Sequence, residues 1–461
     1  MAAKSLEKIV ALAKRRGFVF PGSEIYGGLA NSWDYGPLGV ELKNNIQQLW
    51  WKFFVHERDD MEGLDAAIIM NPKVWEASGH ISEFTDPMVE CKKCHQRFRA
   101  DQLLSRMLSD SRWKDVKKKL YLDSRDELPD LLNVCPNCGS KEFTEPKKFN
   151  LLFPVKLGVS EDTAVTSYLR GEIAQAMFVN FKNVLDSTRV KIPFGIASQG
   201  KAFRNEITPG NFIFRTREFD LMEFEYFIKE SDWKEAFDMW HKEMYRWIET
   251  LGIDKSHVHD LEKKDLAHYS KRTVDLEYDF PFGREELYGL AYRTDFDLKN
   301  HMEASGVDLT YADPDTGEKY LPHVIEPTFG LTRTVLAVLC DAYQEEDERT
   351  VLKLNPRLAP YKVAVFPLLK NKPELVEKAR SIYSELKKHF NVAWDERGNI
   401  GKRYFAQDEI GTPFCVTVDF DTLGEEKPEL KDTVTIRDRD SMKQERIHTS
   451  DIVAFIKKGL E

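Results

Sequence analysis

The chain has 461 residues, of which 42% are hydrophobic and 31% charged, the proportions of a water-soluble globular protein. No apolar run approaches the roughly 18 residues of a membrane span, and the first residues lack the apolar core of a signal peptide, so we expect a cytosolic protein without membrane contact. The formal net charge of −10 disfavours indiscriminate coating of nucleic acid, because such binding depends on neutralising many phosphates. At this length about two or three domains are expected.

Near the amino end, the segment Trp33-Asp34-Tyr35-Gly36-Pro37-Leu38-Gly39 precedes a helix that the sequence predicts over Val40–Val55. One face of this helix is too aromatic and aliphatic to be solvated. The pattern therefore indicates a helix that lies in a core or at an interface.

Four of the six cysteines form two Cys-x-x-Cys pairs, at Cys91 and Cys94 and at Cys135 and Cys138. Disulfides are not expected in a cytosolic chain, and two such pairs supply the four thiolates that a structural Zn²⁺ prefers. The alternative is a set of buried thiols or a degenerate site without metal. The long spacer contains a predicted helix, Asp101–Leu122, that can be looped out. We expect His95 at the surface, and Cys340 and Cys415 in the core.

An arginine, an acid and an aromatic residue follow one another in Phe203-Arg204-Asn205-Glu206 and, after a polar loop, Arg217-Glu218-Phe219. An arginine fork suits the α-phosphate of ATP, a glutamate can accept a hydrogen bond from the adenine amino group, and Phe219 can stack on the base. Taken alone, the pattern is equally well explained by a hairpin of Ala202–Glu206 and Arg217–Phe227 with a charged turn.

Further along, a long amphipathic helix is predicted over Asp232–Leu251, ended by Gly252. The segment Glu326-Pro327-Thr328-Phe329-Gly330-Leu331-Thr332-Arg333 then leads into a buried helix predicted over Thr334–Tyr343. Arg333 falls in the first turn of that helix, where a cation opposes the helix dipole. An anionic ligand at the helix start explains Arg333 better than a structural role does.

After the proline-containing segment Asn355–Pro360, strands and helices alternate, which predicts a mostly parallel or mixed sheet. The predicted strands are Lys362–Pro367, Asn391–Asp395, Phe414–Asp419 and Thr433–Asp438, and the predicted helices are Pro373–Phe390 and Lys402–Ile410.

These segments resemble, in the same order, the three signature motifs of class II aminoacyl-tRNA synthetases, and their residues are similar to those of the glycyl-tRNA synthetases of the dimeric type. The likeness extends to Arg15–Pro21, Asn71–His80, Arg293–Leu298 and Gly401–Tyr404. It implies an α+β fold: an antiparallel-sheet catalytic core in residues 1–83 and 150–354, a zinc-ribbon-like insertion in 84–149, and an α/β anticodon-binding domain in 357–461. It also implies a homodimer.

The resemblance implies that the chain activates glycine with ATP and Mg²⁺ to glycyl-adenylate and transfers glycine to the 3′ end of tRNA(Gly). Arg204, Arg333 and Glu286 would be catalytic. The ATP-binding residues would be Arg204, Asn205, Glu206, Phe214, Arg215, Arg217, Glu218, Phe219, Glu286, Leu287, Gly330 and Arg333. The tRNA would meet local basic patches, for which Lys14–Arg16, Lys114–Lys119 and Lys402–Arg403 are candidates; a solvated face is the simpler explanation of Lys114–Lys119.

Glycine has no side chain, so it must be selected by a pocket in which an added methyl displaces hydrogen bonds to carboxylates. The residues implied to contact glycine are Arg99, Glu172, Phe219, Glu223, Arg293, Glu326, Thr328 and Gly330. The chain departs from the family at Gly171, Ile173, Ala176 and Thr328, where the family usually has proline, threonine, glycine and serine. We expect Ala176 and Thr328 to narrow the glycine pocket.

Two other functions stay open. A synthetase fold can serve as a non-catalytic nucleic-acid-binding accessory protein, but such a protein would be expected to lose Arg204 and Arg333, which are present. A ligase for another amino acid is disfavoured by the carboxylate-rich pocket.

Overall fold

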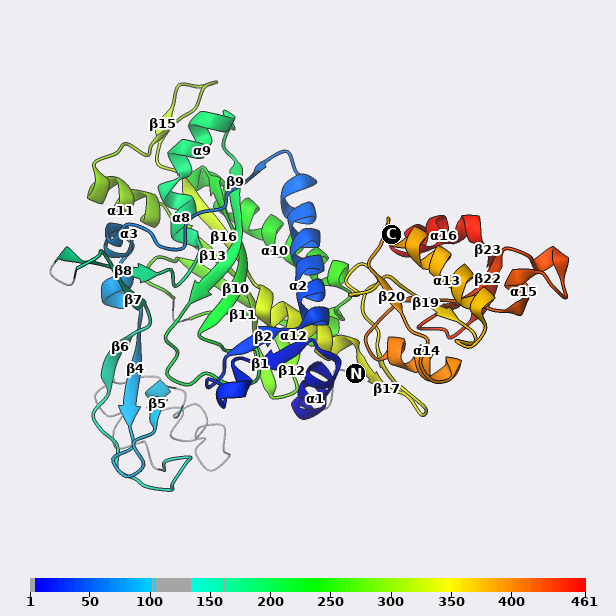
Figure 1. Ribbon diagram of the computed structural model, residues 1–461. Helices are drawn as coiled ribbons and strands as arrows, with labels where there is room; N and C mark the ends of the chain where they lie inside the picture. Colours follow the sequence, from blue (N-terminus) through cyan, green and yellow to red (C-terminus); the bar gives the residue numbers. More distant parts are fainter. Residues whose placement is uncertain (1–4, 102, 104–133, 161–162, 265) are drawn as a thin grey trace.

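A seven-stranded sheet, ordered β11-β12-β13-β16-β10-β9-β3, forms the centre of the computed structural model, which describes residues 5–101, 103, 134–160, 163–264 and 266–461 (Figure 1). All neighbouring strands are antiparallel except β3 and β9. The predicted hairpin is the pair β9–β10. The strands are β3 (Met61–Gly63), β9 (Phe194–Phe203), β10 (Glu218–Ile228), β11 (Val258–Glu262), β12 (Arg272–Phe280), β13 (Gly283–Thr294) and β16 (His323–Gly330).

Helices cover both faces of this sheet because its central strands carry apolar side chains on both sides. On β10, Met222 and Phe224 belong to the core cluster that includes side chains of α2 (Pro37–Trp51), α10 (Trp233–Leu251) and α12 (Leu331–Ala342). Leu221 and Phe227 point the other way, toward α8 (Ala174–Val179), α9 (Phe181–Thr188) and α11 (Phe296–Ser305). This alternation is the two-residue period of a strand.

The three long helices predicted for the core are present, with small differences at their ends. Helix α10 stops at Gly252, whose φ of 80° suits glycine, as predicted. Helix α12 begins at Leu331, so Arg333 lies in its first turn. Helix α2 starts earlier than predicted, at Pro37, because proline is well suited to the first helical position, and it continues as a wider turn over Lys52–His56. Its buried residues, including Leu42 and Trp50, pack into the core.

The amino-terminal segment packs against the first turn of α2. It contains α1 (Leu6–Arg16) and the pair β1 (Val19–Pro21) and β2 (Trp33–Tyr35). A Cβ at Gly39 would lie only 1.8 Å from the carbonyl oxygen of Phe18, so this close approach requires glycine. Smaller elements of the core are α3 (Pro72–Ala77), α4 (His80–Glu83), β7 (Phe153–Leu157), β8 (Val165–Leu169), β14 (Tyr311–Ala312), β15 (Lys319–Tyr320), β17 (Tyr343–Glu345) and β18 (Thr350–Leu352).

The cysteine-containing insertion extends from the core as a three-stranded sheet of β4 (Thr85–Glu90), β5 (Arg97–Arg99) and β6 (Lys147–Asn150) (Figure 1). Apart from Asp101 and Leu103, the helix predicted over Asp101–Leu122 lies outside the described residues, as does the patch Lys114–Lys119.

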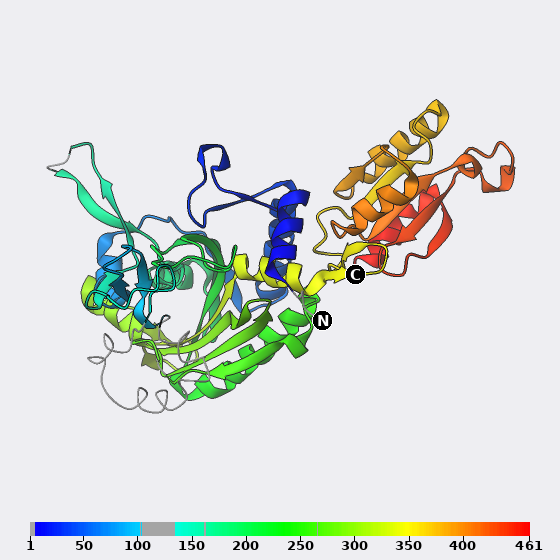
Figure 2. The same cartoon turned by 90° about the horizontal axis from the view of Figure 1, so that it is seen from below.

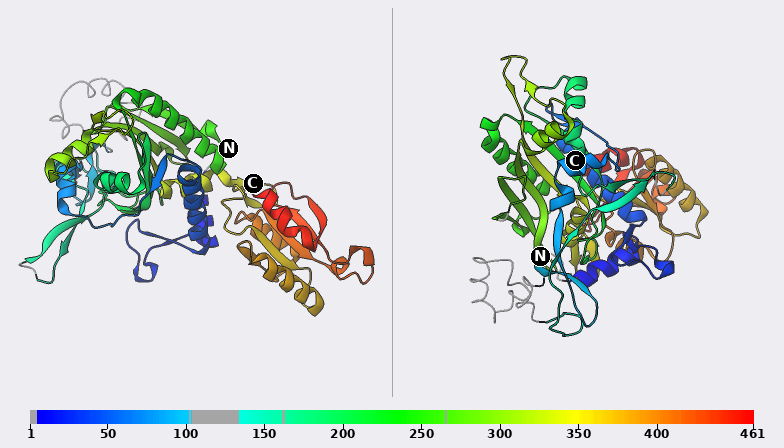
Figure 3. Two further views of the ribbon diagram at one scale, coloured as in Figure 1. Left: turned by 90° about the horizontal axis from the view of Figure 1, so that it is seen from above. Right: turned by 90° about the vertical axis from the view of Figure 1, so that its left-hand side faces the viewer.

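The C-terminal segment forms a five-stranded mixed sheet, ordered β20-β19-β21-β22-β23, in a body beside the core (Figure 2 and Figure 3). Strand β19 pairs in parallel with β20 and β21, and the remaining pairs are antiparallel, as the alternation predicted. Strand β23 and helix α16 were not predicted. The elements are β19 (Val363–Pro367), α13 (Pro373–Leu386), β20 (Val392–Trp394), α14 (Ile400–Asp408), β21 (Phe414–Val418), α15 (Phe420–Leu423), β22 (Thr433–Asp438), β23 (Gln444–His448) and α16 (Ile452–Gly459).

In two of the predicted basic patches, the arginines bind other parts of the chain. Arg403 is 3% exposed, and its guanidinium donates to the carbonyl oxygen of Pro367 at 2.6 Å. Arg16 donates to the carbonyl oxygen of Ala406 at 2.7 Å, and Arg15 forms an ion pair with Glu409. Arg403 holds the C-terminal domain together, and Arg15 and Arg16 fasten α1 to it. Lys14, Arg15 and Lys402 are exposed, so contact of these two patches with tRNA stays a prediction. Within the described ranges, no helix is long and apolar enough to cross a membrane.

Candidate active site

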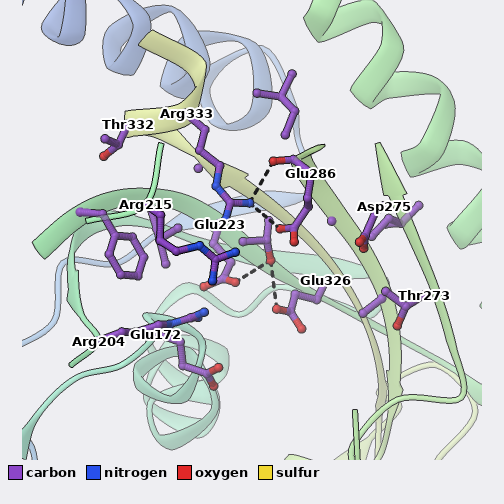
Figure 4. Close-up of a pocket in the computed structure, with 18 of the residues that line it drawn as sticks. Glu172, Arg204, Arg215, Glu223, Thr273, Asp275, Glu286, Glu326, Thr332 and Arg333 are labelled. Atoms are coloured by element: carbon purple, nitrogen blue, oxygen red, sulfur yellow. Dashed lines mark hydrogen bonds and ion pairs between the residues drawn. The ribbon is translucent and has the colours of Figure 1, made fainter. Parts of the chain in front are cut away.

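A cavity of about 340 Å³ opens on the central sheet, lined by side chains of β10, β12, β13, β16, the start of α12 and the loop between β9 and β10. Figure 4 shows arginine and glutamate side chains converging on this one space from elements far apart in the sequence. The predicted site residues that line it are Glu172, Arg204, Glu206, Phe214, Arg215, Phe219, Glu223, Glu286, Leu287, Glu326, Thr328, Gly330 and Arg333.

Arg204 is held by one carbonyl group and two aromatic rings. Its Nε donates to the carbonyl oxygen of Gly171 at 3.0 Å. Its guanidinium carbon lies 5.4 Å from the ring centroid of Phe219 and 5.1 Å from that of Phe84. No other described residue accepts a hydrogen bond from this guanidinium, so its remaining N–H donors can bind an anion in the cavity.

Two further arginines reach the cavity, and each lies beside a glutamate. Arg215 lies 3.5 Å from Glu206, whose Oε2 is buried and accepts no hydrogen bond from any described residue. Arg333 lies 2.9 Å from the carboxylate of Glu286 and also donates to its carbonyl oxygen at 3.0 Å. The guanidinium carbon of Arg333 lies 4.5 Å from the ring centroid of Phe214. Three arginines in one cavity make an anion-binding end.

Another part of the cavity lining, here called the acidic end, consists of Glu172, Glu223 and Glu326 and is organised by buried Arg293. This guanidinium donates to Glu326 at 2.6 Å and to Asp297 at 2.8 Å, and lies 3.9 Å from Glu172. It is fully buried and does not line the cavity. Burial opposes ionisation of Glu172, yet the charge and hydrogen bond of His80, 3.2 Å away, and the charge of Arg293 hold the pKa of Glu172 below its ordinary range.

Thr328 joins two glutamates of the acidic end. Its hydroxyl lies 2.6 Å from Glu223 and 3.0 Å from Glu326, and it can donate its single proton to one of them at a time. Burial, followed by the charges of Glu326 and Glu172, raises the pKa of Glu223 well above its ordinary value. The acidic end is therefore short of positive charge, which suits a ligand with an ammonium group.

The four predicted zinc ligands come together in the insertion. The Sγ atoms of Cys91 and Cys138 lie 3.6 Å apart, as do those of Cys94 and Cys135, and all four Sγ atoms lie within 4.8 Å of one another. A tetrahedral zinc with Zn–S bonds of about 2.3 Å places its sulfurs about 3.8 Å apart, so the geometry fits such an ion. His95 is exposed and pairs with Glu90, as expected of a surface residue, while Cys340 and Cys415 are buried.

Comparison with known proteins agrees with this geometry. The family described as "tRNA synthetase class II core domain (G, H, P, S and T)" matches residues 159–342, and the family "Anticodon binding domain" matches residues 362–459. The chain is 54% identical to the glycine–tRNA ligase of Geobacillus thermodenitrificans over 99% of this chain and 98% of the relative. It is 51% identical to that of Alkaliphilus oremlandii over 99% of each chain. The chain belongs to the glycine–tRNA ligase family. The family and the fold class expected from the sequence motifs are thus confirmed.

Several residues to which the family resemblance gave a role lie outside the cavity lining. Arg99 pairs with Asp86 at 2.8 Å, and Arg217 donates to the carbonyl oxygen of Ala30 at 3.3 Å. Glu218 is exposed because it neighbours Phe219 on a strand, where successive side chains point to opposite faces. Asn205 likewise does not line the cavity; its backbone N–H donates to Leu151.

The four departures from the glycine–tRNA ligase pattern fall in different surroundings. Only Thr328 lines the cavity; Ile173 and Ala176 are fully buried away from it, so the prediction that Ala176 narrows the pocket is wrong. A Cβ at Gly171 would lie 2.9 Å from the ring of Phe84, one of the two rings against Arg204. A proline at that position would therefore displace Phe84, which explains the glycine.

Some residues of the site were not predicted. Asp275 and Lys263 line the cavity and pair at 2.7 Å, and burial, followed by the charge of Glu286, raises the pKa of Asp275 to about 6. Asp297 binds Arg293 from four residues further along the chain. Glu225 lies behind the acidic end. The alternation of β10 carried a signal for Glu225, because it shares a face with Glu223.

Proposed function

We propose that this chain joins glycine to tRNA(Gly) with ATP, and that the cavity of Figure 4 is where glycine is activated. One observation carries the proposal: a cationic end built from Arg204, Arg215 and Arg333 meets an acidic end built from Glu172, Glu223 and Glu326 in a single cavity. ATP and glycine are complementary to these two ends. Their reacting groups, the α-phosphate and the glycine carboxylate, then meet between them.

In the first step a glycine carboxylate oxygen attacks the α-phosphorus, the bond from that phosphorus to pyrophosphate breaks, and glycyl-adenylate forms. Arg204 binds the α-phosphate and stabilises the charge that develops on it, because its donors are fixed beforehand by Gly171 and by the two rings. Arg215 and Arg333 bind the outer phosphates. Magnesium enters with ATP as part of the substrate, and Glu286 is the residue proposed to contact it.

The adenine base stacks on Phe219, and its amino group donates to the buried Oε2 of Glu206, which accepts no hydrogen bond from any described residue. In the second step, a hydroxyl of the terminal adenosine of tRNA attacks the glycyl carbonyl, and AMP leaves. A covalent enzyme intermediate is not needed in either step.

The glycine ammonium binds among Glu172, Glu223 and Glu326, and Arg293 positions these carboxylates from behind the cavity wall. A methyl on the substrate would displace a carboxylate oxygen from a hydrogen bond, leaving charge poorly paired. We further propose that the four cysteines bind a structural Zn²⁺, that residues 357–461 read the anticodon, and that the protein is a cytoplasmic homodimer.

ATP–pyrophosphate exchange with each of the twenty amino acids, followed by charging of tRNA(Gly), tests the proposal. Exchange that depends on glycine alone supports it. Exchange with a different amino acid would show that the pocket selects another substrate. No exchange with any amino acid, in a folded protein that binds tRNA, would identify a non-catalytic accessory protein.

A further inference from the structure

Three glutamates lie together at the acidic end, two of them lining the cavity and one, Glu225, outside the lining. Glu223 and Glu225 are two residues apart on β10 and so share one face of the sheet. The β10–β16 register pairs Glu223 with Thr328 and Tyr226 with Ile325, which places Glu225 opposite Glu326. One carboxylate oxygen from each of the three glutamates lies within 4.8 Å of those of the other two. Like charges directly opposite one another on paired strands repel.

The three carboxyl groups differ in their hydrogen-bond and ion-pair partners. Glu326 pairs with Arg293 at 2.6 Å, and Glu223 lies 2.6 Å from the Thr328 hydroxyl. Glu225 is 0% exposed, and neither of its oxygens has a hydrogen-bond partner among the described residues. It does not line the cavity, so substrate cannot satisfy it directly.

The charged groups around Glu225 do not compensate a further negative charge. Arg293 of β13 is the cation that faces it, and Glu326 of β16, Glu223 of β10 and Asp297 of α11 are the anions. Arg293 already donates hydrogen bonds to Glu326 and Asp297. Burial, followed by the charge of Glu326, raises the pKa of Glu225 well above its ordinary value, in agreement with this imbalance.

We propose that Glu225 is a positioning residue that carries a proton and donates it to the carboxylate of Glu223 or of Glu326, one at a time, holding that oxygen toward the glycine ammonium. A neutral acid in this place adds a donor to an acceptor-rich cluster and withholds a negative charge that no cation balances. The glycine-binding glutamates are then fixed from three directions: by Thr328, by Arg293 and by Glu225. This inference rests on the proposed glycine pocket and adds a residue outside it.

The test uses the full-length protein and three variants. Glu225→Gln keeps the shape and an N–H donor but cannot ionise, whereas Glu225→Met keeps a similar volume and has no donor. Glu235→Gln, at an exposed position of helix α10 and outside the cavity lining, is the control. The Michaelis constants for glycine and ATP are measured by pyrophosphate exchange.

We expect Glu225→Gln to stay within about twofold of wild type, and Glu225→Met to raise the glycine KM about tenfold or more with the ATP KM unchanged. If Glu225→Gln and Glu225→Met are impaired to the same extent, an ionised carboxylate is required at this position. If both variants are as active as wild type, Glu225 does not position the glycine-binding carboxylates. Either result overturns the proposal.

Infrared spectroscopy gives a second readout that does not depend on activity. A protonated Glu225 in wild type at neutral pH gives a carbonyl stretching band that Glu225→Gln lacks and Glu235→Gln retains. If wild type and Glu225→Gln show the same carboxylic-acid bands, Glu225 is not protonated and the inference fails. If wild type shows this band but no glycine-dependent pyrophosphate exchange, the proposed function is refuted instead.

Discussion

Removing the Thr328 hydroxyl is the sharpest test of the glycine pocket, because that hydroxyl is the one described side-chain donor to Glu223. Thr328→Val keeps the shape of the side chain and removes the donor that lies 2.6 Å from Glu223 and 3.0 Å from Glu326. A hydrogen bond to a charged group contributes about 1.5–3 kcal/mol. The expected loss in kcat/KM for glycine is therefore about 10- to 150-fold.

The matched variant is Thr328→Ser, which keeps the hydroxyl, removes only the methyl and restores the residue usual in the family. It should keep glycine use within about twofold of wild type or improve it slightly, because the lost methyl only loosens the pocket wall. Both variants are assayed by glycine-dependent pyrophosphate exchange, with the KM for ATP as internal control. Equal activity of the Val and Ser variants would refute the assigned hydrogen bond. Loss of glycine activation in Thr328→Ser would refute the glycine pocket itself.

Four further predictions concern other parts of the molecule. Arg204→Ala should lower the rate of adenylate formation by about 2.7–4 kcal/mol of transition-state stabilisation, measured by single-turnover kinetics; a change confined to the KM for ATP would contradict this. Metal analysis of freshly purified protein should find about one zinc per chain, lost in Cys135→Ser, which should impair tRNA charging more than adenylate formation. Truncation from residue 357 should keep pyrophosphate exchange and abolish efficient charging of tRNA. The truncation removes Asp408, the buried partner of Arg349 at 2.6 Å, so it is combined with Arg349→Gln to avoid an unpaired charge. Between the ordinary glutamate pKa and the raised pKa of Glu225, wild-type Glu225 keeps its proton in the folded state and loses it on unfolding, so wild type loses stability as the pH rises through this window. The glutamine of the Glu225→Gln variant has no proton to lose. The melting temperature of Glu225→Gln should therefore rise relative to that of wild type as the pH increases. Calorimetry at several pH values that finds a constant difference would contradict that sign.

Long, strongly periodic elements could be predicted from the sequence. Helix α10 and helix α12 present continuous apolar faces, and each was predicted to within a few residues of its start and end. The short pair β1–β2, the insertion strands and strand β23 were not predicted, whereas strands of similar length in the C-terminal segment were, because there they alternate with helices.

Charged residues were the harder part, since their environment is set by tertiary structure. Lys402 and Arg403 are adjacent in a basic pair, yet Arg403 is buried because three carbonyl groups, those of Pro367, Leu368 and Gly398, accept its donors. Nothing local in the sequence distinguishes such an arginine from one that binds tRNA. The cavity glutamates were found only because each lies in a segment that resembles the family, and Glu225 lies in one of those segments with no role attached.

Cavity size cannot be what selects glycine. The cavity of about 340 Å³ has to admit ATP as well, so a single extra methyl does not exceed its volume. Alanine can be rejected only where the carboxylate oxygens are unable to move aside, and each glutamate is held by a neighbouring side chain: Glu172 by His80, Glu326 by Arg293, and Glu223 by Thr328. Displacing such an oxygen breaks a hydrogen bond and leaves a buried group unsatisfied, which costs about 1–3 kcal/mol, against about 0.8 kcal/mol that the methyl gains by burial. Selection of the smallest amino acid therefore depends on the residues behind the wall, so changes at Arg293 or Glu225 should relax discrimination against alanine without touching substrate.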